Sequence, residues 1–340
     1  MKNISAPRKG LLQQEQLDII IDYKCNANCP HCIQDIRYQS DVAGDQHFFA
    51  QLRRVFDYYF HEIGGRRVII TGGEPSIFPH KLLGILRMLQ DYPAPEFIAT
   101  YTNGSGLLKQ VAGEGASLLE KAAEEGLTDL NLSVHDYEPT RNRAFMRLQQ
   151  LPDAELIANE SKKLGIRLRL NCNLIAEHIG DFDGVVKYLE WARRLQPKDI
   201  YLRDLHRIRD QSAATQFAKK AEKILYVDRQ RVDFDGLVQK MLASPLFKLT
   251  GKWGYKHAGQ GEQYNFMYQD LPVRIGYIDI GNEDDDQATY FVFAPDGKLY
   301  ADWNGPGSLH NHPVNLDPSN EERYHEKSSD YSSNSVPRVA

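Results

Sequence analysis

Three of the four cysteines of this 340-residue chain, Cys25, Cys29 and Cys32, lie within one short stretch of sequence. Three thiolates at x3 and x2 spacing can hold a metal cluster from a single loop, because thiolates are soft ligands suited to iron–sulfur clusters. Four-iron clusters usually take four cysteine ligands, so such a loop leaves one iron without a protein thiolate. We expect chemistry at that open position. The fourth cysteine, Cys172, is too distant in sequence to be a local fourth ligand.

A zinc site is the alternative for the same loop. His31 precedes Cys32 directly, and three cysteines with one histidine are a common set of zinc ligands. Neighbours in sequence, however, seldom both reach one tetrahedral ion. The spacing therefore favours a cluster over a single zinc ion.

The composition is that of a large soluble protein. Hydrophobic residues make up 41% of the chain, enough for a substantial core in one large domain or a main domain with an extension. A net charge of −5 gives no overall attraction to nucleic acid or to an anionic membrane, although Arg203, Arg207 and Arg209 lie close together. No apolar run suits a signal peptide or a bilayer span, and the clustered cysteines fit a reducing compartment. We expect a cytoplasmic protein without a membrane or nucleic-acid partner.

Short apolar segments alternate with segments of helical periodicity. Strands are predicted over 17–23, 67–71, 96–102, 128–134, 166–174 and 199–203, and helices over 47–63, 81–89, 116–125, 153–164 and 182–194. Such alternation predicts a parallel sheet with right-handed crossovers. No GxGxxG follows the first strand, which disfavours a dinucleotide-binding fold. The predicted fold class is α/β, a partial (β/α)6 TIM-like barrel with a C-terminal α+β extension.

The pattern divides the chain into four parts. Residues 1–16 are a short polar segment, and residues 17–205 form the barrel. Residues 206–317 form the extension, with helices over 211–224 and 234–242 and strands over 273–280 and 289–293; we expect it to cover the barrel mouth. Residues 318–340 are polar and are expected to be a mobile tail.

Polar motifs follow the predicted strands at their carboxyl ends. The cysteine loop follows the first strand, residues 72–75 (GGEP) follow the second, residues 102–104 (TNG) end the third and residues 133–136 (SVHD) end the fourth. In barrels of this kind the chemistry lies on the loops at these ends. The motifs are therefore expected to meet at one end of the barrel.

With cysteines at this spacing after a first buried strand, and GGEP after the second, the chain resembles the radical SAM enzyme superfamily over residues 17–205. The resemblance implies a [4Fe-4S] cluster held by Cys25, Cys29 and Cys32, whose fourth iron chelates the amino and carboxylate groups of S-adenosylmethionine. Electron transfer from the reduced cluster would cleave the sulfonium and give a 5'-deoxyadenosyl radical that abstracts a substrate hydrogen. The missing fourth thiolate would then be the place of the cofactor.

The resemblance also implies cofactor contacts from the first two loops. His31 fills a position that is usually aromatic in the family and lies near the adenine. The backbone of Gly72 and Gly73, with Glu74 and Pro75, would hold the methionyl ammonium. Glycine permits the close approach that such a contact needs.

Further cofactor contacts are implied at the ends of the later strands. Asn103 belongs to the segment that resembles the family's third-strand motif, and Ser133 and His135 resemble polar residues that meet the ribose or the methionyl carboxylate. The family commonly places an asparagine after the fifth strand for the ribose, and backbone after the sixth meets the adenine. In this chain these two strands end in Asn171, Asn173, Tyr201 and Arg203.

Cys172 lies between the two asparagines of the fifth strand. Because side chains alternate along a strand, either the asparagines or Cys172 point into the barrel. A thiol inside the barrel could donate a hydrogen atom to a substrate radical, as in some epimerases of the superfamily. A lone cysteine in a strand can also be a small buried hydrophobe, and both interpretations stay open.

The predicted function is radical SAM chemistry on a polar small molecule, such as a sugar, nucleoside or amino-acid-derived metabolite, with flavodoxin or ferredoxin as electron donor. Ribosomal-peptide modification is an alternative, disfavoured because no further cysteines could hold an auxiliary cluster and little sequence precedes the first strand. Activation of a glycyl-radical enzyme and a structural metal-binding role are further alternatives. Candidates in the extension to close the barrel over substrate are Trp253, Tyr255, His257, Trp303, Asn304, His310 and His312.

Overall fold

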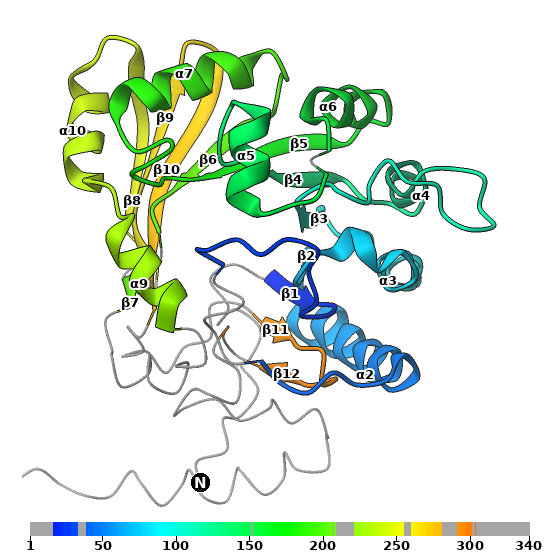
Figure 1. The fold of residues 1–340 in the computed structure, drawn as a ribbon. Coiled ribbons are helices and arrows are strands. Elements are labelled where there is room, and N and C mark those ends of the chain that lie inside the picture. Colours follow the sequence, from blue (N-terminus) through cyan, green and yellow to red (C-terminus); the bar gives the residue numbers. More distant parts are fainter. Residues whose placement is uncertain are drawn as a thin grey trace, which may run out of the picture.

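Six parallel strands form the centre of the molecule. A computed structural model describes residues 16–32, 39–150, 152–205, 207–208, 221–254, 260–280, 291–300 and 303. The strands are β1 (Gln16–Ile20), β2 (Arg67–Thr71), β3 (Phe97–Thr102), β4 (Asp129–Ser133), β5 (Arg167–Asn173) and β6 (Asp199–Arg203). They lie side by side in chain order and do not close into a ring (Figure 1). The predicted α/β class and partial barrel are confirmed.

Helices between the strands cover one face of this sheet. They are α2 (Asp45–Asp57), which continues as the π-helical turn η1 (Tyr58–Ile63), α3 (Pro79–Leu89), α4 (Leu118–Glu124), α6 (Ala154–Lys163) and α7 (Phe182–Arg193). Local signals fix where several of them begin: Ser117 and Glu120 form a capping box on α4, and Asp153 and Asp181 cap α6 and α7. A short helix, α5 (Pro139–Met146), follows β4 and is not predicted by its weakly amphipathic sequence.

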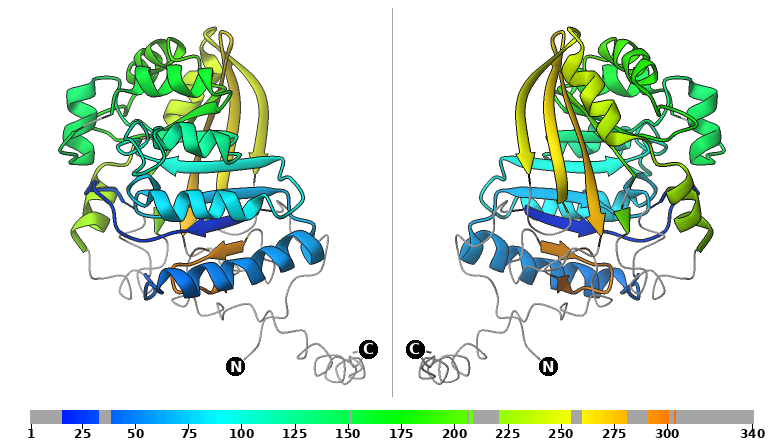
Figure 2. Two further views of the ribbon diagram at one scale, coloured as in Figure 1. Left: turned by 90° about the vertical axis from the view of Figure 1, so that its right-hand side faces the viewer. Right: turned by 90° about the vertical axis from the view of Figure 1, so that its left-hand side faces the viewer.

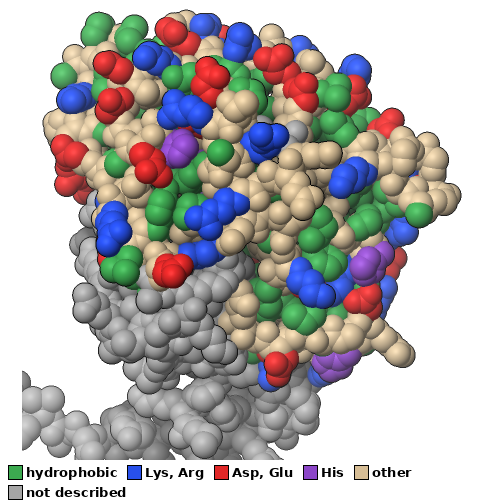
Figure 3. All heavy atoms as spheres, in the orientation of Figure 1, with side chains coloured by type: hydrophobic (Ala, Val, Ile, Leu, Met, Phe, Trp, Pro, Cys, Tyr) green, Lys and Arg blue, Asp and Glu red, His purple; other side chains and the backbone are tan. Residues whose placement is uncertain are grey.

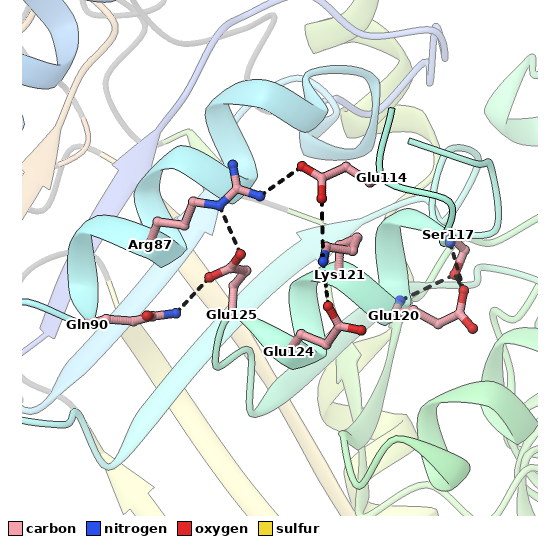
Figure 4. A network of polar contacts seen from close by, with 8 residues as sticks. All are labelled: Arg87, Gln90, Glu114, Ser117, Glu120, Lys121, Glu124 and Glu125. Atoms are coloured by element: carbon pink, nitrogen blue, oxygen red, sulfur yellow. Dashed lines mark hydrogen bonds and ion pairs between the residues drawn. The ribbon is translucent and has the colours of Figure 1, made fainter. Parts of the chain in front are cut away.

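A surface network ties α3 to α4 on the outside of the barrel (Figure 4). Arg87 donates to Glu125 at 2.9 Å and to Glu114 at 3.1 Å. Gln90 bonds the other oxygen of Glu125 at 2.7 Å, and Lys121 lies 3.4 Å from Glu114. These groups are largely solvent-exposed, so water screens their attraction and they add little to stability.

The two faces of the strands differ in polarity. Leu130 and Leu132 of β4 point to the helices and belong to the main hydrophobic core, as do Leu168 and Leu170 of β5. The residues between them on the inner face are polar, beginning with the fully buried Asp129 on β4. The later strands therefore alternate in polarity rather than being apolar throughout, and the inner face is polar on β4–β6, whereas Ile69, Phe97 and Ala99 make it apolar on β2 and β3.

The C-terminal extension lengthens the sheet at both edges. β10 (Leu271–Ile280) pairs in parallel with β6, and β11 (Phe291–Phe293) pairs in parallel with β1. β8 (Phe247–Gly254) and β9 (Gln260–Tyr268) continue antiparallel beyond β10, where the twist of the sheet turns them steeply against β1–β4 (Figure 2). The remaining elements are β7 (Arg207–Ile208), α9 (Ala221–Arg229), α10 (Phe234–Ala243) and β12 (Leu299–Tyr300).

Several expectations concern residues that the structure does not describe. They are the segment before residue 16, the tail over 318–340, and the candidates Tyr255, His257, Asn304, His310 and His312. Trp303 is described, and its indole Nε1 donates to Asp18 on the inner face of β1 at 3.0 Å. None of the helices seen in the described ranges is long and apolar enough to cross a bilayer. One face of the molecule shows charges of both signs interspersed (Figure 3).

Candidate active site

The cysteine loop rests on a small apolar cluster of its own. Phe145 and Met146 of α5 form this cluster with residues that follow β5 and β6 and with Val227 of α9, and Cys29 packs against it. The backbone N–H of Asn28 donates to the carbonyl of Met146 at 3.1 Å, and the sulfur of Cys29 lies 3.8 Å from the same oxygen. Helix α5 and the extension thus hold the cysteine loop in place.

The three thiols do not converge on one point. Among the described residues, no three Cys, His, Asp or Glu side chains are close enough to hold a single metal ion. Burial, with the charges of Cys32 and Cys25, raises the pKa of the Cys29 thiol above its ordinary value. A metal would offset this effect by holding the sulfur as thiolate. The cluster that the cysteine spacing favours over a zinc ion stays a prediction at this level.

The glycine pair after β2 allows two loops to touch. A side chain on Gly72, whose φ is +146°, would lie 2.4 Å from the carbonyl oxygen of Asp22, and one on Gly73 would lie 2.0 Å from that of Lys24. The N–H groups of Gly73 and Glu74 donate to these same carbonyls at 2.8 and 3.0 Å. Glycine is therefore required here to bring the second loop against the segment that leads into Cys25.

Glu74 links the second loop to the third. Its side chain is only 1% exposed and accepts hydrogen bonds from the N–H of Ser76 at 2.9 Å, the N–H of Asn103 at 2.6 Å and the hydroxyl of Thr102. Burial raises the pKa of Glu74 above its ordinary value, and these hydrogen bonds oppose the rise. The carboxylate is thus occupied by protein donors, and its predicted contact with the cofactor ammonium stays a prediction.

Asn103 extends this network to the cysteine loop. Its amide Nδ2 donates to Asn26 at 3.0 Å, and its Oδ1 accepts from the N–H of Ser105 at 2.9 Å. Asn26 in turn donates to the hydroxyl of Ser105 at 2.7 Å. Because Asn26 follows Cys25 directly, the end of β3 fixes the first cysteine of the loop. We refer to Asn26, Glu74, Thr102 and Asn103 together as the loop network.

His31 and His135 face each other around Phe145. The ring of His31 stacks on Phe145 with centroids 4.8 Å apart and meets His135 edge-on at 4.9 Å. Burial, with electrostatic contributions from His178 and Arg203, lowers the pKa of His135 to about 3. The N–H of Asn173 donates to Nδ1 of His135 at 3.1 Å, which leaves the proton of the neutral ring on Nε2. His31 is thus buried and packs against Phe145 and His135.

The later strands carry the other predicted cofactor residues on the inner face. Ser133, Asn171 and Tyr201 are register partners across β4, β5 and β6, and Arg203 follows Tyr201 two residues on. Asn171 is 5% exposed, and neither polar atom of its amide has a hydrogen-bond partner. The structure therefore brings these residues together on one surface, and their contacts with cofactor stay predictions.

Cys172 takes the opposite face. Its side chain is fully buried in the core between sheet and helices, and burial raises the pKa of its thiol. The asparagines on either side of it therefore occupy the inner face of β5. This position argues against a hydrogen-atom donor, because the thiol lies on the far side of the sheet from the polar surface.

Three inner-face residues are missing from the sequence-based prediction. Tyr101 and Asn131 are register partners on β3 and β4, and Arg274 of β10 is the register partner of Tyr201. The alternation of DLNLS over β4 holds a signal for Asn131. Arg274 gives no such signal, because nothing local in the sequence places β10 beside β6.

A fourth missing residue comes from the extension. Lys223 of α9 donates to the carbonyl of Cys29 at 2.8 Å and to the side chain of Asn28 at 3.1 Å. The extension therefore places a positive charge directly on the cysteine loop. This contact also shows that at least one helix of the extension lies at the candidate site.

Curated relatives of this chain share one name. A probable GTP 3',8-cyclase of Sulfolobus acidocaldarius is 28% identical over 193 residues, covering 56% of each chain. The GTP 3',8-cyclase of Pectobacterium atrosepticum is 34% identical over 36% of this chain and 34% of its own. That of Vibrio cholerae is 31% identical over 44% of each. The chain thus matches between a third and somewhat over half of these relatives' length.

Solved structures give weaker matches. Streptococcus suis SuiB bound to S-adenosylmethionine is 12% identical with a TM-score of 0.48, over 89% of this chain and 61% of that one. The radical SAM coproporphyrinogen III oxidase of Escherichia coli is 13% identical with a TM-score of 0.45, over 69% and 53%. Both scores are low, so the description of the fold rests on its own strand order.

The family model of the radical SAM superfamily matches residues 19–192. This range covers half of the 340 residues, from β1 through α7. It includes the cysteine loop, the loop network and all of the first five strands but the start of β1. The chain therefore belongs to the radical SAM superfamily and is an enzyme whose cofactors are a [4Fe-4S] cluster and S-adenosylmethionine.

Proposed function

We propose that this enzyme abstracts a hydrogen atom from a polar small molecule bound against the inner face of the barrel. The single observation that carries the proposal is the polarity of that face: Asn131, Asn171, Tyr201 and Arg203 all lie there, next to the loops of the site. A sugar, nucleoside or amino-acid-derived metabolite would present the hydroxyl, amide or charged groups that such a surface can bind.

The relatives support the nucleoside option within this class. They are named for a reaction of GTP, a guanine nucleotide. Because the chain matches no more than 56% of their length, we carry over only the chemical type of substrate and not their reaction.

The cofactors, when bound, supply a 5'-deoxyadenosyl radical. The residues of this chain bind and orient the cofactors and shield them. Cys25, Cys29 and Cys32 would hold the cluster, and the loop network fixes the loop that carries them. His135, kept neutral by burial, would present an N–H at Nε2 to cofactor or substrate. The apolar cluster around Phe145 covers one side of Cys29.

Anaerobic reconstitution tests the proposal. The cluster-loaded enzyme, reduced in the presence of S-adenosylmethionine, should form 5'-deoxyadenosine, and a deuterated substrate from the proposed class should pass its label to that product. Cys32→Ala should lose the cluster and the reaction, whereas Cys172→Ala should keep both. A chain that binds no cluster, or that leaves S-adenosylmethionine intact, would contradict the enzyme proposal and favour a structural metal site.

Flavodoxin or ferredoxin remains the proposed electron donor. The cysteine loop carries the half-exposed Cys29 and Cys32 and the exposed Cys25, so a small redox protein could approach it. Replacing a chemical reductant by reduced flavodoxin in the same assay tests this pairing. The cytoplasmic location expected from composition stays a prediction.

A further inference from the structure

At the base of the inner face, charged side chains pair with one another. Arg169 and Asp199 join through two hydrogen bonds of 2.5 Å, and Asp129 binds both Arg167, at 2.6 Å, and Lys198. These pairs lie at the amino ends of β4, β5 and β6 and close that end of the barrel with satisfied charges. The side chains at this end are therefore bound to one another rather than available to a ligand.

Nearer the site, two arginines have no carboxylate partner among the described residues. The guanidinium of Arg203 lies 4.4 Å from the ring centre of Tyr201, and that of Arg274 lies 5.6 Å from the same ring. Arg203 also donates to the hydroxyl of Tyr101 at 3.1 Å. Two positive charges around one ring repel each other, so the arrangement favours an anion between them.

Unpaired polar atoms lie on the same inner face as these arginines. Asn131 is 0% exposed, and both its amide oxygen and its amide nitrogen lack a hydrogen-bond partner; the Nε of Arg203 lacks one too. Buried polar atoms are nearly always paired, because an unpaired one costs about 1–3 kcal/mol. The unpaired Nε of Arg203, which is only half-buried, therefore points to a ligand that supplies the missing partner.

The position of these groups suits a substrate. Asn131 is in register with Tyr101 and with Arg169. It lies two residues closer to the amino ends of the strands than the pair Ser133 and Asn171. The Arg203–Tyr101 hydrogen bond reaches from β6 to β3 across the two strands between them. Asn131 thus lies between the paired charges at the base of the barrel and the residues that the resemblance assigns to the cofactor, which include Arg203.

We infer that this surface binds an anionic substrate, whose phosphate or carboxylate lies between Arg203 and Arg274. The planar guanidinium of arginine matches both kinds of anion through paired N–H bonds. The inference rests on the proposed function, since it names the chemical class of the substrate. It uses the side chain of Arg203, whereas the expected adenine contact uses backbone.

Equilibrium binding to the enzyme loaded with cluster and S-adenosylmethionine, without reduction, tests the anion site. Titration calorimetry with inorganic pyrophosphate and with malonate separates a phosphate site from a carboxylate site. At least one probe should bind, and Arg203→Gln and Arg274→Gln should each weaken it about tenfold or more. The control is Arg193→Gln, which removes a surface arginine paired with Asp270. Absence of binding by both probes, or equal weakening in the control, would overturn the inference.

A second variant tests the unpaired amide. Asn131→Leu replaces it by an apolar group of similar size, so the ligand-free enzyme should melt about 2–4 °C higher. A lower melting temperature would show that the amide stabilises the fold. The two proposals fail separately: loss of S-adenosylmethionine cleavage with intact anion binding contradicts only the reaction, and the reverse contradicts only the anion site.

Discussion

Glu74 in the loop network and Asn131 on the inner face of β4 are both buried and polar, yet their hydrogen bonding is opposite. Glu74 uses both carboxylate oxygens on donors of its own chain. Asn131 uses neither atom of its amide. A saturated network holds its neighbours in place, whereas an unsaturated one stores a free-energy cost that a ligand can remove. The first region positions the cluster loop, and the second is where the substrate should bind.

The largest effect on stability is expected from replacing Glu74, whose carboxylate oxygens are both hydrogen-bonded within the chain. Glu74→Leu leaves the N–H groups of Ser76 and Asn103 and the hydroxyl of Thr102 without an acceptor, and should lower the free energy of unfolding by about 3–5 kcal/mol. Urea denaturation measures this. Glu74→Gln, which keeps one acceptor oxygen, should lower the free energy of unfolding by less. If Glu74→Leu were as harmless as Asn131→Leu, the contrast between the two regions would be false.

A pH titration probes the boundary between the regions, where His135 faces His31, His178 and Arg203. Its pKa is about 3 when folded and 6.5 in the unfolded chain, so only the unfolded state takes up a proton between these values. Stability is therefore complete above pH 6.5 and falls as the pH drops toward 3. His135 should account for about 2–3 kcal/mol between pH 7 and pH 4.

Comparison with His135→Asn isolates this contribution. Asparagine keeps an acceptor for the N–H of Asn173 but does not titrate, so its unfolding free energy should depend less steeply on pH over the same range. Urea denaturation of both proteins at pH 7, 5.5 and 4 supplies the two slopes. Equal slopes would mean that His135 is protonated in the folded protein as readily as in the unfolded chain.

A smaller effect is expected where the extension meets the cluster loop. Lys223→Met removes a positive charge beside Cys29, and since reduction makes a cluster more negative, its potential should fall by on the order of tens of millivolts. Redox titration followed by electron paramagnetic resonance measures this. Lys223→Arg should keep the wild-type value. A shift of the same size in both variants would assign the contact to loop packing instead of charge.

The smallest effect is expected at the surface network of Figure 4. Arg87→Ala removes two exposed ion pairs, and its thermal melt should coincide with that of the wild type because water and salt already screen them. Anaerobic cluster loading should be unchanged as well. A marked loss of stability would mean that polar networks outside the barrel matter as much as the buried ones.

Sequence periodicity predicts the barrel well because its strands are short, apolar on the helix side and punctuated by motifs. The predicted strands over 67–71 and 199–203 match β2 and β6 residue for residue. β8 and β9 escape prediction, since glycines and charged residues interrupt their apolar pattern and pairing with β10 defines them.

The residues of the candidate site, too, are only in part predictable from the sequence. The cysteine, GGEP and TNG motifs are readable because each is contiguous in the chain. The roles of Glu74 and Asn131 cannot be read from the sequence, because they depend on which donors and acceptors the neighbouring strands bring near. Even Cys172, whose alternation with two asparagines is plain in the sequence, needs the structure to say which set faces inward.

The pairing of β1 with β11 has a consequence for biosynthesis. β1 carries the cluster loop, yet one of its two neighbours is made only when residues 291–293 are translated. At the usual 5–20 residues per second, β1 waits on the order of 10–45 s after β2 with one side unpaired. Exposed strand edges invite wrong pairing. The growing chain should therefore be most prone to aggregation before its last strands emerge from the ribosome.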